Sequence, residues 1–486
     1  MLEYKKAEIA KPNPRSTINS YRSFGYNLST AIADIIDNSI SANSNEITIA
    51  FKWSGQDSFI LIKDNGDGMN KEELVIAMTP GSKDPEDERS ENDLGRFGMG
   101  LKTASFSQCK RLTCISKRAN YSTIKRCWDI DFINKEQEWQ LLDYISDSNL
   151  LNEIDKLKSG TLVLWEKLDR IVGNADSNNE SVKNAFYQEM QNVREHLSLV
   201  FHKFIESKRI KIFFQNEEIE AYNPFLLNLD PKPEMGLTEK FDNVEVTYFI
   251  LPHMSEIGKE NYDKTGGSLG WFQQQGFYVY RGDRLLVSGD WMGLEKKRDY
   301  SKLARIAVNF SNSSDFNWNL DIKKSTATPP IEIRRELTRI AKVAIMKSAK
   351  IYNWRGQKSS SQIKNSTFEP LWKDEITREG IKKYKINRKH PIINSLLTEN
   401  NKLMSKALKL LEENVPIELI LSNQNEDPAF HELEKHSETP NDDLIKLAVE
   451  LYKIYVHQGI PKSLAKQQIM TSTPFNLFPL INEYLK

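Results

Sequence analysis

Polar side chains stand at helical spacing in one early apolar segment, LSTAIADIIDNSISA, residues 28–42. We expect a helix that begins at an N-cap of Ser29 or Thr30, and residues four apart then share one face. This spacing places the carboxylate of Asp34 beside the amide of Asn38, a pair that could hold a water and a hard cation such as Mg²⁺. An amphipathic surface helix with a polar face would show the same pattern. Both interpretations stay open on this segment alone.

A second group of such residues follows an apolar strand pattern in ILIKDNGDGMN, residues 60–70. The strand would end at Asp64, whose carboxylate could accept a hydrogen bond from an exocyclic amine. Gly66 and Gly68 allow a tight turn and a close approach of a ligand to the backbone. The letters DNGDG also describe an acidic hairpin turn. A calcium loop is disfavoured because the distal glutamate at the twelfth position is missing.

A third, glycine-rich segment, DLGRFGMGLKTAS at 93–105, leads into a helical start. Glycines there let backbone N–H groups and a helix N-terminus face phosphates, and a lysine adds a positive charge. The spacing is not that of a P-loop, and no strand leads into it as in a dinucleotide-binding fingerprint. A glycine-rich loop alone is therefore not specific for phosphate. The residues concerned are Gly95, Gly98, Gly100, Lys102 and Thr103.

Taken in order, the three segments read D-x-x-D-N, D-N-G-D-G-M and G-R-F-G-M-G-L-K. This order resembles the GHKL ATPase superfamily of gyrase B, MutL, the ninety-kilodalton heat-shock chaperone, histidine kinases and the MORC ATPases. The resemblance covers roughly residues 20–170 and looks most like the bacterial MORC-like and MutL members. It implies a Bergerat fold, in which helices cover one face of a mixed sheet in an α/β sandwich, with ATP and Mg²⁺ as cofactors.

The resemblance also implies roles for individual residues. Asn38 would ligate Mg²⁺, and Asp64 would bind the adenine amine. Gly66 and Gly68 would let the base and ribose lie close, and Thr161 of the late G-T pair would support the adenine-binding carboxylate through water. Residues 79–100 would form an ATP lid. The other residues expected around the nucleotide are Met69, Gly98, Gly100, Leu101, Lys102 and Thr103.

A basic residue further along the chain completes the implied site. WNLDIKKSTATPP, residues 318–330, resembles the segment whose basic side chain reaches the γ-phosphate in MutL, gyrase B and the chaperone. Lys324 aligns best with that residue, and Lys323 is the alternative. A pair of surface lysines at a strand end would have the same sequence.

The candidate base departs from the family pattern, because most hydrolytic members carry glutamate where this chain has Asp34. Aspartate is one methylene shorter, and a misplacement of about 1 Å can lower a rate roughly 10²-fold. Asp34 is therefore predicted as the base of a slow ATPase or one with a relayed water, while Asp37 is turned away from the Asn38 face. The family implies a homodimeric clamp that closes on ATP. A nucleotide-gated scaffold or chaperone-like protein with little or no hydrolysis is the alternative.

The elements that must position these residues indicate an α+β protein. Strand patterns occupy 46–53, 58–64 and 161–168, and helical spacing occupies 182–207. A second α/β region, similar to the transducer domain of MORC-type proteins, ends in a long helix at 331–353, and the remainder is mainly helical. The predicted parts are 1–20, an N-terminal arm; 21–207, the ATP-binding domain; 208–354, the transducer domain; 355–366, a linker; and 367–486, a helical C-terminal region.

Composition limits the class of protein and its partners. The 486 residues carry 67 basic and 67 acidic side chains, so net charge predicts no nucleic-acid partner and any basic surface must be local. KKYKINRKHP, at 382–391, could contact phosphates of double-stranded DNA, and a solvated linker and helix face is the other interpretation. DNA, or a DNA-processing or phage-defence complex, is the predicted client.

Location follows from what the sequence lacks. No run of about 18 uncharged apolar residues occurs, which predicts no membrane span. The three cysteines have no metal-ligand spacing and are typical of intracellular thiols. Because the first residues also lack the apolar core of a signal peptide, a cytoplasmic protein is expected.

Overall fold

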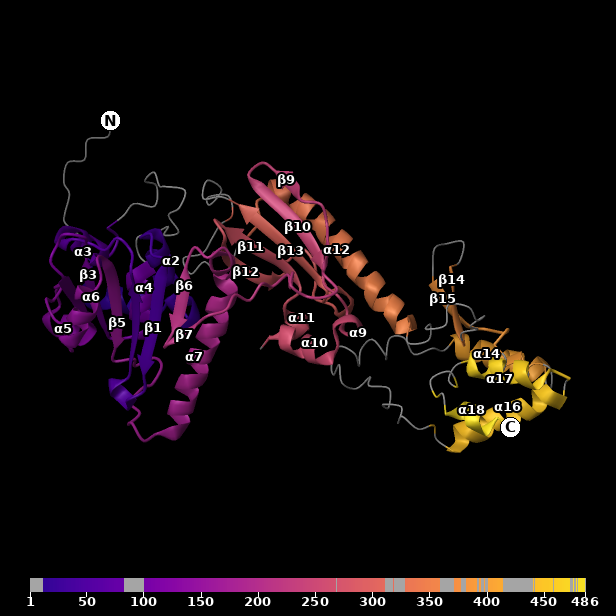
Figure 1. Cartoon of the computed structure of the whole chain (residues 1–486). Helices are drawn as coiled ribbons and strands as arrows, with labels where there is room; N and C mark the ends of the chain where they lie inside the picture. Colours follow the sequence, from indigo (N-terminus) through magenta and orange to yellow (C-terminus); the bar gives the residue numbers. More distant parts are fainter. Residues whose placement is uncertain are drawn as a thin grey trace. The chain divides into compact units, whose positions relative to one another are not determined.

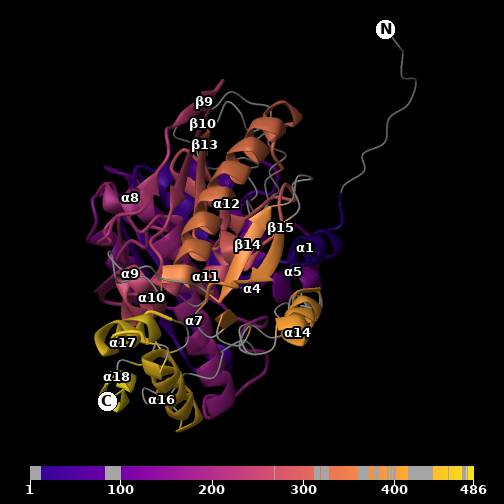
Figure 2. The same ribbon diagram turned by 90° about the vertical axis from the view of Figure 1, so that its right-hand side faces the viewer.

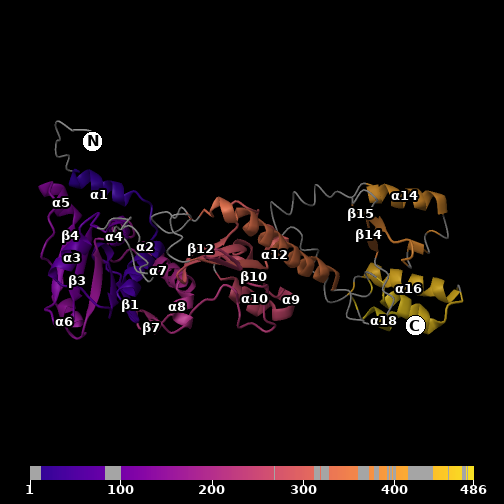
Figure 3. The same cartoon turned by 90° about the horizontal axis from the view of Figure 1, so that it is seen from above.

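The computed structural model forms two compact units, Met1–Tyr352 and Asn353–Lys486, and Figures 1, 2 and 3 show their helices and strands from three directions. The structure describes residues 12–82, 100–267, 269–310, 318, 328–358, 371–376, 382–390, 393–394, 397, 401–413, 440, 442–457, 459–472, 475, 478 and 480–485.

The first sheet has seven strands in the order β4-β3-β5-β2-β1-β6-β7. Its paired strands run antiparallel except β1 and β6, which are parallel, so the sheet is mixed as the Bergerat fold implies. The predicted strands at 46–53, 58–64 and 161–168 are present as β1, β2 and β5. The bounds are β1 Glu46–Lys52, β2 Phe59–Asp64, β3 Arg111–Lys117, β4 Ile124–Asp129, β5 Gly160–Glu166, β6 Lys211–Phe214 and β7 Glu217–Glu218.

Helices cover this sheet mainly on one face. Apolar side chains of α1 to α5, α7 and α8 join those of the sheet in one large core, while α6 packs on the opposite face against Leu61, Ile115 and Leu162. This arrangement confirms the α/β sandwich. The bounds are α1 Pro14–Arg22, α2 Leu28–Ser41, α3 Lys71–Met78, α4 Gly100–Gln108, α5 Ile130–Glu136, α6 Asn149–Asp155, α7 Glu180–Val200 and α8 His202–Glu206, with a short 3-10 helix at Gly55–Asp57.

The predicted N-terminal arm at 1–20 is wrong for its second half. Asn13 caps α1, whose Ile18 is fully buried in the core, and α1 lies beside α4 and α5 (Figure 3). Arg22 at its end donates to the carbonyl of Cys109 at 3.0 Å and pairs with Asp169 at 2.6 Å. Because the segment is mostly polar, its sequence gave no sign that Ile18 and the guanidinium of Arg22 would be buried. Residues 1–11 lie outside the described part of the chain.

The second sheet has six strands, with β12-β11-β13-β10-β8 in order and β9 paired to β10. Helix α12 covers one face of this sheet, and Leu337, Ile340 and Ala344 pack against it (Figures 1 and 2). The bounds are β8 Glu234–Met235, β9 Glu239–Phe241, β10 Val244–Ile250, β11 Gly276–Arg281, β12 Arg284–Asp290, β13 Ala304–Phe310, α9 Met254–Ile257, α10 Lys259–Gly266, α11 Gly270–Gln273 and α12 Ile331–Lys358, with a 3-10 helix at Asp299–Ser301.

Two predicted boundaries differ from these elements. Strands β6 and β7 belong to the first sheet, so a domain boundary at 207 falls before that sheet is complete. A parallel pair needs a crossover, and α7 and α8 lead into β6 beside β1. Helix α12 extends to Lys358 and takes the first residues of the predicted linker at 355–366, whose remainder lies outside the described residues.

The second compact unit is mainly helical, as predicted, with one added two-stranded sheet. Its largest core joins α16, α17 and α18 through side chains such as Leu451, Tyr455 and Ile469. None of the helices in the described part of the chain is long and apolar enough to cross a membrane. The bounds are β14 Trp372–Ile376, β15 Lys382–Ile386, α14 Asn401–Glu413, α16 Asp442–His457, α17 Lys462–Met470 and α18 Ile481–Tyr484.

Candidate functional site

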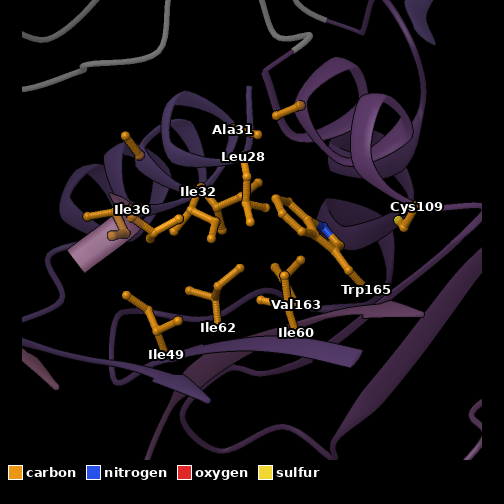
Figure 4. Close-up of a cluster of buried hydrophobic side chains, with 14 of the residues drawn as sticks. Leu28, Ala31, Ile32, Ile36, Ile49, Ile60, Ile62, Cys109, Val163 and Trp165 are labelled. Carbon is orange, nitrogen blue, oxygen red and sulfur yellow. The ribbon is translucent and has the colours of Figure 1, made fainter. Parts of the chain in front are cut away.

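Helix α2 carries the first candidate residues. Its apolar side chains Leu28, Ile32 and Ile36 point toward the sheet in Figure 4. The helix is capped by Asn27, which accepts from the N–H of Thr30 at 2.8 Å, so the predicted cap at Ser29 or Thr30 is displaced by two or three residues. Burial of the apolar stripe fixes the rotation of the helix about its axis and therefore the direction of its polar residues.

Asp34 and Asn38 differ in their surroundings, although they are one turn apart. Asp34 is 3% exposed, and the hydroxyl of Tyr26 donates to its Oδ2 at 2.8 Å. Asn38 is exposed, so its amide oxygen can reach a ligand. A buried, oriented carboxylate beside an exposed amide oxygen fits a nucleotide-bound Mg²⁺ that keeps several water ligands.

The N-terminus of α4 lies next to this carboxylate. A Cβ added to Gly100, the first residue of α4, would lie 4.0 Å from Oδ2 of Asp34. Free N–H groups and the helix dipole make a helix N-terminus favourable for phosphate. Leu101 packs on the core and Thr103 is fully buried, so both residues hold α4 in place. The predicted base and the predicted phosphate-binding helix therefore meet.

Lys102 has a different environment from the one expected at a phosphate. Its side chain is buried, and its Nζ donates to the carbonyl of Ala77 at 2.8 Å. That carbonyl belongs to the last turn of α3, where a cation is favoured by the helix dipole. In this structure Lys102 joins α4 to α3.

Asp64 ends β2 and is almost completely buried. Its carboxylate accepts hydrogen bonds from the hydroxyl of Ser39 at 2.8 Å and from the N–H groups of Gly66 at 2.9 Å and Thr161 at 3.2 Å. Burial raises the pKa of Asp64, and the three hydrogen bonds oppose that shift. A carboxylate has about four acceptor positions, so one more donor, such as an exocyclic amine, can be accommodated.

Two serines that the sequence analysis did not select complete this group. Ser39 holds Asp64 directly. Ser116 on β3 lies 3.0 Å from the hydroxyl of Thr161 and accepts from the N–H of Met69 at 2.8 Å. Ser39 directly follows Asn38 in the first motif, so the sequence could have selected it. Ser116 comes close to Thr161 through the pairing of β3 with β5, which no local sequence pattern indicated.

The two glycines of the D-N-G-D-G motif are required by the protein's own packing. A Cβ at Gly66 would lie 2.6 Å from the carbonyl oxygen of Ala42. Gly68 has φ +66, and its Cβ would lie 1.9 Å from the carbonyl oxygen of Lys117. Because real Cβ atoms do not approach so closely, glycine is needed at both positions even without a ligand.

Some predicted site residues fall outside the described part of the chain. These are Gly95 and Gly98, residues 83–99 of the predicted lid, and Lys324 with its alternative Lys323. Among the described residues, no group of three or more His, Cys, Asp or Glu side chains could hold a metal ion by itself.

Part of this chain is similar in sequence to known ATPases. Residues 26–161 match the family described as histidine kinase-, DNA gyrase B-, and HSP90-like ATPase. ATPase morc-1 of Caenorhabditis elegans is 31% identical over 117 residues, which are 24% of this chain and 13% of the worm protein. The ATPase and transducer domains of DNA topoisomerase II from Balamuthia mandrillaris align with 68% of this chain and 86% of theirs, at a TM-score of 0.39 and 10% identity.

Residues 26–161 of this chain therefore match the GHKL ATPase family, and the chain is similar over 117 residues to a MORC ATPase, in agreement with the three motifs. The family match includes both Asp34 and Asp64 and ends at Thr161. The chain covers about an eighth of the worm relative, at 13% of its length.

Proposed function

We propose that the chain is a slow Mg²⁺-dependent ATPase that closes as a homodimeric clamp when it binds ATP. The observation that carries the proposal is the meeting of buried Asp34 with the N-terminus of α4 at Gly100. This places a candidate general base at the point where the helix dipole favours phosphate. The domain family supports ATP as the nucleotide.

Each group has a defined task in this proposal. Asp64, held by Ser39 and by the N–H of Thr161, accepts a hydrogen bond from the adenine amine. Asn38 contributes its amide oxygen to Mg²⁺, which when bound neutralises phosphate charge. Asp34 takes a proton from the attacking water, and the hydroxyl of Tyr26 holds its Oδ2, the carboxylate oxygen that faces Gly100. Lys324 would contact the γ-phosphate.

Slow turnover follows from the length of the base. The carboxylate of Asp34 is one methylene shorter than the usual glutamate and is tethered by Tyr26. A carboxylate about 1 Å away from the best position lowers the rate roughly 10²-fold, and slow hydrolysis suits a switch. The alternative is a nucleotide-gated scaffold, or a chaperone-like protein, in which the same site binds ATP with little or no hydrolysis.

The proposed client is double-stranded DNA or a DNA-processing or phage-defence complex in the cytoplasm. The support is the basic segment KKYKINRKHP at 382–391, whose first residues form β15 in the second compact unit. Lysines along a strand suit phosphate contacts without base recognition.

Steady-state ATP hydrolysis by the full chain, with and without double-stranded DNA, tests these proposals. Asp34→Ala should bind ATP but not hydrolyse it, and Asp64→Asn should weaken ATP binding. Asp57→Ala, at an exposed position, is the matched control and should behave as the wild type. Tight ATP binding without turnover in the wild type would favour the scaffold, and no ATP binding would overturn the proposal. Sedimentation with a non-hydrolysable analogue should give a dimer.

A further inference from the structure

A buried ion pair joins the candidate nucleotide site to the second sheet. Asp37 on α2 is paired with Arg284, the first residue of β12, and their side chains are 1% and 5% exposed. The Nε of Arg284 donates to Oδ1 of Asp37 at 3.1 Å and lies 3.4 Å from Oδ2. A further N–H of the same guanidinium donates to the carbonyl of Leu285. The arginine is therefore held on both sides in one orientation.

Asp37 lies in α2 beside the two candidate-site residues of that helix, so a contact at Asp37 affects both of them. Asp37 stands three residues after Asp34 and directly before Asn38. Successive helix residues are fixed in direction by the helix itself, so a contact that holds Asp37 also fixes where Asp34 and Asn38 point. A buried ion pair contributes little net stability compared with apolar packing of the same volume. The main effect of the Asp37–Arg284 pair is therefore to fix the orientation of α2.

The turn that carries Arg284 contacts α8 and the residues on either side of that helix. Asp283, in the same turn, pairs with Arg209 at 2.5 Å and lies 3.6 Å from Lys203. The guanidinium carbon of Arg284 lies 5.2 Å from the ring centre of Phe201. On β11, the hydroxyl of Tyr280 lies 2.9 Å from Nε2 of the buried His202. The hairpin of β11 and β12 is thus placed by several directional contacts.

We propose that Arg284 is a positioning residue of the nucleotide site, and that the Asp37–Arg284 pair couples nucleotide binding to the β11–β12 hairpin. Nucleotide bound through Asn38 would hold α2 in one position, and the ion pair would transmit that preference to residues 276–290. The inference rests on the proposed function, because it takes the nucleotide to bind beside α2.

Arg284→Met is the direct test. Turnover should fall about 10²-fold, since loss of the anchor lets the base move by about 1 Å. Hydrogen exchange of residues 276–290 should slow on addition of a non-hydrolysable ATP analogue in the wild type and should not respond in the variant. Arg284→Lys keeps the charge but loses the planar fork, so an intermediate turnover is expected.

Two further variants separate positioning from folding. Arg209→Met removes the exposed ion pair to Asp283 in the same turn and should leave turnover and exchange as in the wild type. Asp37→Leu combined with Arg284→Met leaves no unpaired buried charge, so this double variant should fold with a melting temperature near or above that of the wild type. Its turnover and its exchange response should nevertheless match those of Arg284→Met alone.

The outcomes distinguish this inference from the function on which it rests. If the wild type hydrolyses ATP and the folded double variant turns over and responds equally well, the coupling is absent and only this inference fails. If the wild type does not bind ATP, the proposed function fails and the inference fails with it.

Discussion

Removal of the Tyr26 hydroxyl tests the candidate base Asp34 directly. Its hydroxyl donates to Oδ2 of buried Asp34 at 2.8 Å, and a hydrogen bond to a charged group contributes about 1.5–3 kcal/mol. Tyr26→Phe should therefore lower the turnover number by roughly tenfold or more and leave the dissociation constant of ATP unchanged. Tyr21→Phe, a half-buried tyrosine on α1, is the control in the same assay. Equal turnover of Tyr26→Phe and wild type would mean that this hydroxyl does not hold the reacting carboxylate.

His196, also at the residue scale, makes stability depend on acidity. Burial, and then the charge of Arg284, lower the pKa of His196 to about 4, and its Nε2 has no hydrogen-bond partner among the described residues. Below pH 6.5, the ordinary pKa of histidine, the imidazole of His196 binds a proton in the unfolded chain but stays neutral in the folded chain until the pH approaches 4. Stability is therefore complete above about pH 6.5 and is lost as the pH falls toward 4.

The loss between pH 7.5 and pH 5 should be roughly 2 kcal/mol of unfolding free energy, measured with urea. His196→Gln should remove that part of the pH dependence. His457→Gln, at an exposed position of α16, should keep it. An unchanged pH dependence in His196→Gln would assign the effect to other groups.

At the scale of elements, the turn after β2 requires glycine at position 68, because the backbone of Lys117 packs directly against it. Gly68 and Gly81 have nearly the same backbone, with φ +66 and +67, but a Cβ at Gly68 would meet the carbonyl of Lys117 at 1.9 Å and one at Gly81 would meet nothing within 4 Å. Gly81→Ala should cost only the left-handed strain of about 1–2 kcal/mol. Gly68→Ala should cost several kcal/mol more, because β3 must move.

Urea unfolding of both glycine variants checks this difference. Equal losses of stability would show that the β2 turn can shift away from β3 without cost. The nucleotide affinity of Gly68→Ala, if it folds, would then report whether the glycine also admits a ligand.

The same elements show how far the sequence alone could lead. Alternating apolar residues at 46–53 and 58–64 were enough to predict β1 and β2, and the ordered motifs were enough to predict the sandwich and to select Asp34 and Asp64. Strands β3 and β4 were not predicted, because β3 is stabilised by pairing with distant β5 and β4 by pairing with β3. Ser116 was missed for that reason, since it lies 45 residues from Thr161 along the chain.

The direction of a long side chain was a further limit. Lys102 was selected as a phosphate contact because it follows the glycines, but a flexible four-carbon side chain reaches several partners. The carbonyl of Ala77 in the last turn of α3 is one of them, and it accepts a hydrogen bond from the ammonium group here. Sequence spacing predicts where a Cβ lies, whereas the tertiary neighbours decide where the charge goes.

At the scale of the whole molecule, the two compact units have separate cores. The first unit holds both large sheets, and the second unit buries its own apolar residues, such as Tyr452 and Phe475. Every described candidate-site residue, from Asp34 to Thr161, lies in the first unit, and so does the coupling residue Arg284. The basic strand β15, which supports the proposed DNA contact, lies in the second unit.

This division predicts the behaviour of a fragment that ends at Lys358, the last residue of α12. The fragment keeps both cores of the first unit and should bind a non-hydrolysable ATP analogue with an affinity within about twofold of the full chain, since all described candidate-site residues lie in that unit. Double-stranded DNA should stimulate hydrolysis by the full chain and not by the fragment. Calorimetry for the analogue and steady-state assays for DNA are the measurements. A folded fragment, verified by circular dichroism, that cannot bind the analogue would place part of the nucleotide site beyond residue 358. Retained stimulation by DNA would instead move the client surface into the first unit.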